Sequence, residues 1–190
     1  MQVVLTRNED ADVPLDTRTA LANQTKGDLF ISIHLNAAPG SSAHGAETYF
    51  LAPQATDERA RAVAEAENRG APADPAIATG DEGLQLLLWD LAQSQHLAAS
   101  QSLGRLIQEE LNLTLGLPDR GVRQAPFAVL VGATMPAVLV ELGFITNPQE
   151  ESRLLDPAYR AELLDAVVRA VVRFKSVLEG GAETASAVPE

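Results

Sequence analysis

The stretch "ISIHLNAA", residues 31–38, alternates apolar and polar side chains, which is typical of a β-strand. Ile31 and Ile33 belong to the row expected to anchor the strand in a sheet, whereas His34 and Asn36 belong to the other row. A histidine near the end of a strand lies where open α/β sheets place their sites. The alternative is a partly buried histidine bonded to backbone groups, which is the commoner fate of a lone strand histidine.

The segments around this stretch predict strands that alternate with helices. Before it, "QVVLTR" (2–7) predicts a short strand, and residues 14–27 predict a helix that closes at Gly27. The strand itself should cover 28–35, and a further strand should cover 45–53. We further expect helices over 56–70, capped by Thr56, and over 84–115, and strands over 127–131 and 137–145. Residues 148–179 predict an amphipathic helix or a helix pair, in which Pro157 would open the second helix.

Composition narrows the classes of protein to which the chain can belong. Its 190 residues favour a single domain, followed by a small-residue tail (180–190) that we expect to be disordered. With 26 acidic against 14 basic residues, the formal charge of −12 argues against binding nucleic acid or an anionic membrane. There is no cysteine, so a metal would need histidine and carboxylate ligands. The first residues resemble neither an export signal nor a membrane span.

Glu141 is anomalous because every neighbour from Ala137 to Ile145 is apolar or glycine. A carboxylate carried into a central strand must be paired, hydrogen-bonded, near a metal or at the mouth of a pocket. This makes Glu141 a candidate general base or acid, and an ion pair with an arginine such as Arg123 is an equal alternative. Of the other histidines, His44 is expected to be solvated and His96 to serve helix packing or the surface.

Together, His34 and Glu141 favour a metal hydrolase, in which imidazole and carboxylate ligands hold Zn²⁺ and a carboxylate handles the protons of water. No paired ligand spacing of the HExxH type supplies further ligands. The residues by themselves therefore indicate no more than a possible metal hydrolase.

Four motifs, "VVLTRNEDADVPLDTRTALAN", "DLFISIHLNAA", "GAETYFL" and "MPAVLVELGFITNPQEE", resemble the zinc-dependent N-acetylmuramoyl-L-alanine amidases of type 3, over residues 2–176. The resemblance implies an open α/β sheet, mixed but mostly parallel, with helices on both faces and one catalytic Zn²⁺. It implies hydrolysis of the bond between N-acetylmuramic acid and L-alanine in peptidoglycan. A full-length form should then be exported to the periplasm or cell envelope and act as a monomer.

The resemblance also implies roles for individual residues. His34 would be a zinc ligand, and Glu141 would activate water and protonate the departing amine. Asn36 would orient a ligand or the substrate, with a local turn-capping role as the equal alternative. The family's opening strand with its "DPGHGG" segment, and the helix that carries a glutamate ligand, do not precede "VVLTR", so two of three ligands are missing. We therefore expect a catalytic domain over 1–179 that is truncated, poor in metal and nearly inactive.

Residues 53–116 resemble the inserted helical region of cell-division amidases, in which a helix blocks the zinc until a partner protein moves it. Glu65 or Glu67 would be the carboxylate that caps the metal, and an activator would act on this insertion. The alternative is that this acidic, alanine-rich helix is simply a solvated face. A competing function for the whole chain is an inactive cell-wall binding or regulatory module.

Overall fold

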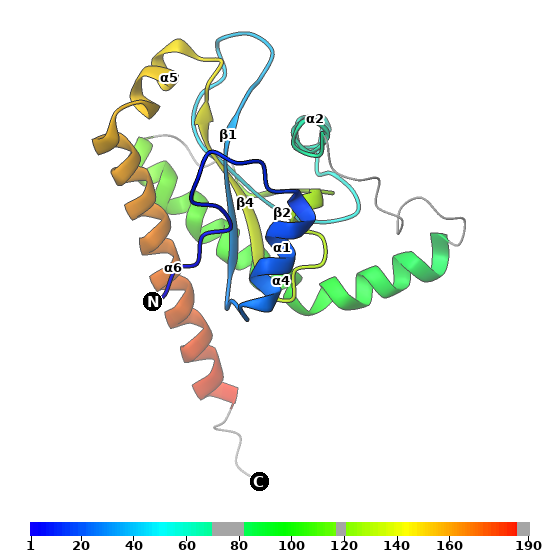
Figure 1. The fold of residues 1–190 in the computed structure, drawn as a ribbon. Coiled ribbons are helices and arrows are strands. Elements are labelled where there is room, and N and C mark those ends of the chain that lie inside the picture. Colours follow the sequence, from blue (N-terminus) through cyan, green and yellow to red (C-terminus); the bar gives the residue numbers. More distant parts are fainter. Residues whose placement is uncertain (70–81, 117–120, 186–190) are drawn as a thin grey trace. The chain divides into compact units, whose positions relative to one another are not determined.

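The computed structural model describes residues 1–69, 82–116 and 121–185 (Figure 1). Helices and strands are interspersed along the chain. Their bounds are α1 Leu15–Gln24, β1 Phe30–Asn36, β2 Glu47–Leu51, α2 Glu58–Glu67, α4 Glu82–Leu115, β3 Arg123–Ala125, the 3-10 turn η1 Ala128–Leu130, β4 Ala137–Phe144, α5 Pro148–Leu154 and α6 Pro157–Ala185. Two strands (β1, β2) or two helices (α2, α4 and α5, α6) sometimes come in succession. None of the helices in the described ranges has both the length and the apolarity needed to cross a membrane.

The four strands form one open sheet in the order β1-β4-β2-β3. Strand β1 runs parallel to β4, because Phe30 N donates to Pro136 O near their starts and Ile145 N donates to Asn36 O near their ends. Strand β2 is parallel to β3, with Tyr49 opposite Arg123. The predicted open α/β sheet, mixed and mostly parallel, is confirmed.

Two compact units divide the chain, and the boundary between them passes through β1, β2 and β4. The first unit comprises residues 1–32, 49–101 and 123–139. Its core includes Phe30, Tyr49 and Leu139, one from each of three strands, together with apolar residues of α2 and η1. The side chain of Asp57 caps α2 by accepting from Ala60 N, and it also binds Arg123. The bond from Ala60 N, followed by that from Arg123, holds the pKa of Asp57 below its usual range.

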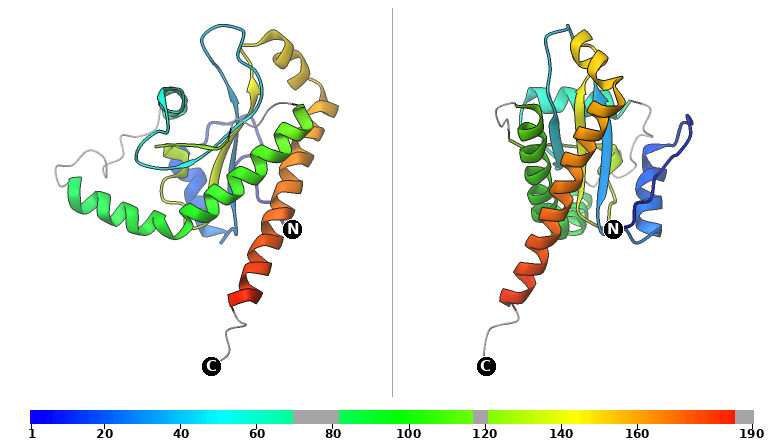
Figure 2. Two further views of the ribbon diagram at one scale, coloured as in Figure 1. Left: turned by 180° about the vertical axis from the view of Figure 1, so that it is seen from behind. Right: turned by 90° about the vertical axis from the view of Figure 1, so that its left-hand side faces the viewer.

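The second unit comprises residues 33–48, 102–122 and 140–190. Helix α5 leads through a short turn into the long helix α6 (Figure 2). The carboxylate of Glu110 on α4 accepts hydrogen bonds from Arg169 and Arg173 of α6, at 2.9 and 2.7 Å. Gln108 of α4 donates to Ala46 O, just before β2, at 3.0 Å. These bonds tie the end of α4 both to α6 and to the part of the sheet that this unit contains.

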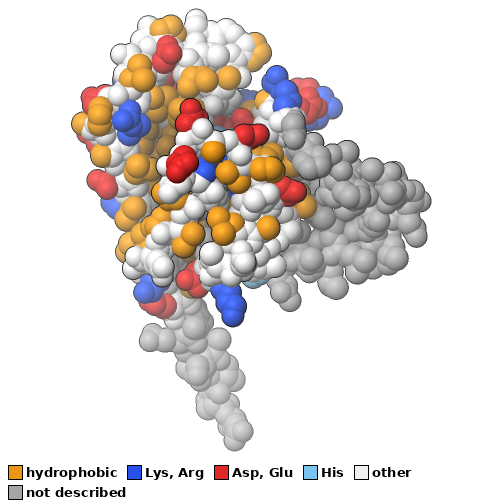
Figure 3. All heavy atoms as spheres, in the orientation of Figure 1, with side chains coloured by type: hydrophobic (Ala, Val, Ile, Leu, Met, Phe, Trp, Pro, Cys, Tyr) orange, Lys and Arg blue, Asp and Glu red, His pale blue; other side chains and the backbone are white. Residues whose placement is uncertain are grey.

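Two predicted strands are wrong. Residues 2–7 form no strand, and Val3 and Leu5 are exposed, like many hydrophobic side chains on the face shown in Figure 3. A strand needs a neighbour for its hydrogen bonds, and within the described ranges the segment pairs with none. Residues 127–131 contain η1 instead of a strand, and the strand comes earlier, as β3. Their apolar run reflects burial in the core, a signal that does not distinguish a strand from another buried segment.

Smaller differences concern the ends of helices. Asp57, one residue after the predicted Thr56, is the N-cap of α2, because its carboxylate reaches the free N–H of Ala60. Helix α6 opens at Pro157 as predicted. It continues to Ala185, into the segment 180–190 that was expected to be disordered; residues 186–190 lie outside the described residues. Within the predicted insertion, 53–116, the structure describes α2 and α4 but not 70–81.

Candidate metal centre

Strand β1 keeps the predicted alternation, but its two rows are the reverse of those expected. The polar row is the inner one, with Ser32 and Asn36 buried and His34 partly buried. The apolar row is open, since Ile33 is 48% exposed and Leu35 is 45% exposed. The prediction that Ile33 anchors the strand is therefore wrong. Because β1 is the end strand of the sheet, helices that cover the central strands need not cover this row.

Strand β4 carries Glu141 and is buried along its whole length. The carboxylate itself is 0% exposed, which confirms that the sequence places an acid in a poorly solvated strand. Side chains alternate along a strand, so Glu141 points to the same face as Leu139, and His34 points to the same face as Phe30. Leu139 and Phe30 belong to one hydrophobic cluster. His34 and Glu141 therefore share a face on adjacent parallel strands, toward the carboxyl end of each.

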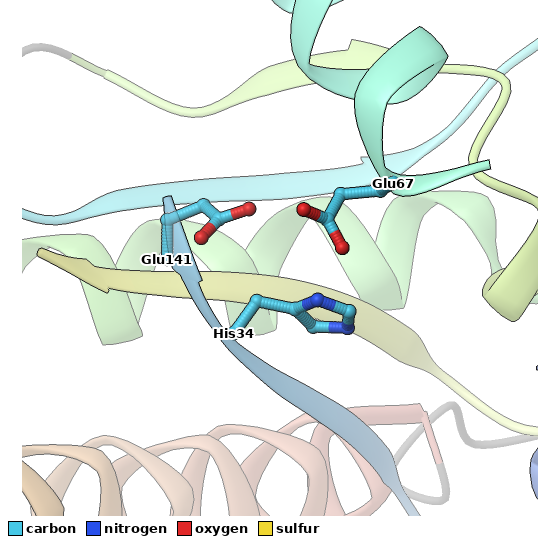
Figure 4. A group of neighbouring side chains, drawn as sticks. All are labelled: His34, Glu67 and Glu141. Atoms are coloured by element: carbon cyan, nitrogen blue, oxygen red, sulfur yellow. The ribbon is translucent and has the colours of Figure 1, made fainter. Parts of the chain in front are cut away.

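Three side chains form a group that could hold a metal ion: His34, Glu67 and Glu141 (Figure 4). Each offers one ligand atom, and these atoms lie within 4.8 Å of one another. His34 and Glu141 both belong to the second unit, whereas Glu67 belongs to the first. The pair on β1 and β4 is therefore the core of the candidate site, because one unit supplies both side chains.

The donor set of this group fits zinc. An imidazole nitrogen and carboxylate oxygens are among the ligands that Zn²⁺ takes in hydrolytic sites, and such sites keep a coordination position for water or substrate. Of the two glutamates expected near the metal, Glu67 belongs to the group and Glu65, which is exposed, does not. Arg123, the expected alternative partner of Glu141, binds Asp57 at 3.0 Å.

Asn36 is the last residue of β1 and shares the inner row with His34. Its side-chain nitrogen is buried and has no hydrogen-bond partner among the residues that the structure describes. A buried donor without a partner costs free energy, so such groups are commonly found where a ligand supplies the missing acceptor. The other two histidines lie apart from the group of three: His44 is exposed, as expected, and His96 is partly buried on α4.

Sequence reasoning missed three buried acids: Glu47 on β2, Glu110 on α4 and Glu150 on α5. Glu47 lies two residues before Tyr49, a member of the hydrophobic cluster, so it faces the same side of the sheet as Glu141. The signal for Glu47 was available, since "ETYFL" opens a fully buried strand with a charged residue. Glu150 gave no such signal, because glutamate is ordinary in the first turn of a helix.

A shallow cavity of about 290 Å³ lies in the second unit. It is lined by His44, Leu115, Asn147, Gln149, Glu150 and Arg153. Neither His34 nor Glu141 lines it, so cavity size alone would not have found the candidate metal centre.

Comparison with known proteins identifies the family to which the chain belongs. A profile of the family described as N-acetylmuramoyl-L-alanine amidase matches residues 1–173. The amidase AmiC of Neisseria meningitidis serogroup B is 34% identical over 182 residues, covering 94% of this chain and 44% of that protein. The amidase AmiA of Escherichia coli K12 is 36% identical over 172 residues, covering 90% of this chain and 60% of that protein. The chain thus spans about half the length of these relatives.

Solved structures show the same fold. An N-acetylmuramoyl-L-alanine amidase from Clostridium difficile 630 superposes with a TM-score of 0.64 at 27% identity, over 92% of this chain and 72% of that one. The catalytic domain of the amidase CwlV from Paenibacillus polymyxa gives a TM-score of 0.64 at 25% identity, over 93% and 73% of the two chains. With the profile match and the His and Glu donor set, they establish that the chain belongs to the zinc-dependent N-acetylmuramoyl-L-alanine amidase family.

Proposed function

We propose that this chain is a hydrolytic domain that cleaves the amide bond between N-acetylmuramic acid and L-alanine of the peptidoglycan stem peptide. The observation that carries the proposal is the pairing of His34 with the fully buried Glu141 on one face of adjacent parallel strands. Burial of a carboxylate costs free energy that neighbouring groups must offset, and buried acids of this kind cluster at functional sites. Membership of the amidase family supplies the substrate class.

In the proposed mechanism, zinc when bound polarises the scissile carbonyl and lowers the pKa of a water molecule. His34 holds the metal through a ring nitrogen. Glu141 accepts the proton that the attacking water loses and passes it to the nitrogen of the departing L-alanine. The buried side-chain nitrogen of Asn36 donates a hydrogen bond to an oxygen of the substrate, which gives that donor the acceptor it lacks in the described residues.

The test is the release of stem peptides from purified peptidoglycan in the presence of Zn²⁺. Replacing Glu141 with Gln should reduce the rate by about 10²–10⁴-fold, the usual contribution of a general base, without unfolding the chain. Glu151→Gln, which neutralises an exposed acid, is the matched control. His34→Ala should lower both the rate and the zinc content. A Glu141→Gln variant as active as the parent would refute the assignment.

An inactive wall-binding module is the competing function, and the same assay separates the two. Such a module would sediment with peptidoglycan but release no peptide, with or without Zn²⁺. The peptidoglycan substrate also implies action in the periplasm or cell envelope, in wall remodelling or separation of daughter cells.

We also propose that Glu67 restrains the enzyme until an activator protein acts on the helical insertion. The support is the resemblance of this region to the helical insertion of cell-division amidases, together with the partial burial of Glu67, since Glu65 is exposed. A carboxylate that occupies the open coordination position would compete with water or substrate. Glu67→Gln should therefore raise the rate of peptide release, and Glu65→Gln should leave it unchanged. Loss of activity in Glu67→Gln would indicate a catalytic ligand instead.

A further inference from the structure

Glu150 is a buried acid that the proposed mechanism does not use. It lies in the first turn of α5 and is only 7% exposed. One carboxylate oxygen accepts from Gly45 N at 2.7 Å, and the other accepts from Phe144 N at 2.8 Å. One side chain thus joins the loop before β2 to the end of β4.

Glu150 occupies the position of the glutamate in a capping box but makes different hydrogen bonds. In "NPQE", 147–150, Asn147 is the N-cap, and its side chain accepts from the backbone N–H groups of Gln149 and Glu150. In a capping box the glutamate at this position bonds back to the N–H of the N-cap residue. Here that N–H donates to Phe144 O, and the Glu150 carboxylate is turned toward β4 and the loop.

The hydrogen bonds between β1 and β4 show that the Glu150 carboxylate takes the place of a backbone acceptor on β1. In an unbroken parallel ladder, the bond from Phe30 N to Pro136 O would be matched by one from Phe144 N to Asn36 O. Ile145 N makes the bond to Asn36 O instead. Strand β4 therefore contains one extra residue relative to β1, and Glu150 accepts the hydrogen bond of the displaced Phe144 N–H.

Gly143 makes this arrangement possible. A Cβ atom at this position would lie 3.3 Å from the Oε2 atom of Glu150 and 3.3 Å from Leu154 Cδ1. Both contacts are tighter than ordinary van der Waals packing. Gly143, two residues after Glu141, thus leaves the space in which the Glu150 carboxylate reaches the end of β4.

The loop that leaves β1 is held by the same segment. Asn147 donates from its side-chain nitrogen to Ala43 O at 3.0 Å, and Ala38 N donates to Thr146 Oγ1 at 3.2 Å. With the bond from Gly45 to Glu150, these contacts fasten both ends of the 37–46 loop to residues 146–150. This loop begins three residues after His34, and all of these groups belong to the second unit.

We propose that Glu150 is a positioning residue for Glu141 and His34: it stabilises the extra residue at the end of β4 and locks the loop that follows β1. A bulge near an active site sets the direction of side chains on its strand. The inference rests on the proposed function insofar as Glu141 is its general base. The hydrogen bonds from Gly45 and Phe144 to Glu150 do not depend on that function.

The test compares Glu150→Gln with Glu151→Gln, its exposed neighbour, in the full chain. The amide places an N–H₂ donor against one of the two N–H groups, so one hydrogen bond is lost. Amide hydrogen exchange at Gly45 and Phe144 should become about tenfold faster or more, with exchange elsewhere unchanged. On a soluble peptidoglycan fragment with Zn²⁺, kcat should fall about tenfold at constant KM. Zn²⁺ titration should show severalfold weaker binding.

Several outcomes would overturn the inference. Exchange that accelerates uniformly, with activity tracking the folded fraction, would make Glu150 a stability residue only. Faster exchange confined to Gly45 and Phe144, with kcat and Zn²⁺ affinity unchanged, would likewise show that Glu150 does not position the site. If even the parent chain releases no peptide, the proposed function fails, and Zn²⁺ affinity with local exchange decides the inference. If Glu150→Gln does not fold, Gly143→Ala, which presses on the same carboxylate, should give the same pattern.

Discussion

Strands β1 and β4 are neighbours in the sheet, and each carries one residue of the candidate pair, yet their surroundings differ. All eight residues of β4 are buried, whereas β1 is buried on one face and open on the other. The difference follows from position, because β4 has a strand on either side and β1 is at the end of the sheet. The same residue types therefore contribute differently to stability on the two strands, and the proposed site lies on the one face that both strands bury.

The largest expected effect comes from the buried strand. Leu139 is 0% exposed within the core cluster, so Leu139→Ala leaves a cavity and should reduce the free energy of unfolding by about 2–5 kcal/mol. Urea denaturation followed by circular dichroism measures the loss. A cost below about 1 kcal/mol would mean that β4 is not the packed centre of the sheet.

Much of β4 could be predicted from sequence, and much of β1 could not, for physical reasons. A run of apolar residues broken only by Glu141 indicates a strand buried on both faces, and the structure has that strand. In β1 the alternation predicts a strand correctly but cannot say which row is inside, since that depends on what packs against it. The role of Glu150 was beyond reach because its partners are backbone N–H groups, which no residue type marks in the sequence, and one of them belongs to the distant Gly45.

Part of the candidate site could likewise be predicted from the sequence, and part could not. His34 and Glu141 were recognisable because each is out of place in its own strand. The separation of Glu67 from Glu65 was not predictable, because both occupy one acidic helix and only its orientation distinguishes them. Segment 2–7 is the opposite case, a predicted element that the structure lacks. Its β-branched residues favour a strand, but a strand forms only beside a neighbour.

Exposure should also determine how much an ion pair contributes to the free energy of unfolding. Glu110 is buried and bonds Arg169 and Arg173, whereas Glu58 and Arg61 form an exposed pair. Hydrogen bonds from Arg169, then from Arg173, hold the pKa of Glu110 below its ordinary 4.5. Glu110→Gln should lower the free energy of unfolding by about 1–2 kcal/mol at pH 7, since hydrogen bonds to charged groups are the stronger ones.

The pH dependence of this difference has a definite sign. Because the pKa of Glu110 is lower in the folded chain than in the unfolded one, its contribution is complete above about pH 4.5 and is lost as the pH falls through the folded-state pKa. The stabilities of the parent and of Glu110→Gln should therefore converge in acid. Glu58→Gln should have no measurable effect at either pH. A constant difference down to pH 3 would show that packing, not charge, is responsible.

The smallest effect is expected on the open row of β1. Leu35 is 45% exposed, so Leu35→Ala removes few contacts and should change the free energy of unfolding by less than about 1 kcal/mol. Compared with Leu139→Ala, this is the same chemical change on the neighbouring strand, so the ratio of the two costs measures exposure alone. If Leu35→Ala costs as much as Leu139→Ala, the open row is covered in solution. Sedimentation velocity would then show whether a second copy of the chain covers the row. If it does, the parent should sediment as a dimer and Leu35→Ala as a monomer.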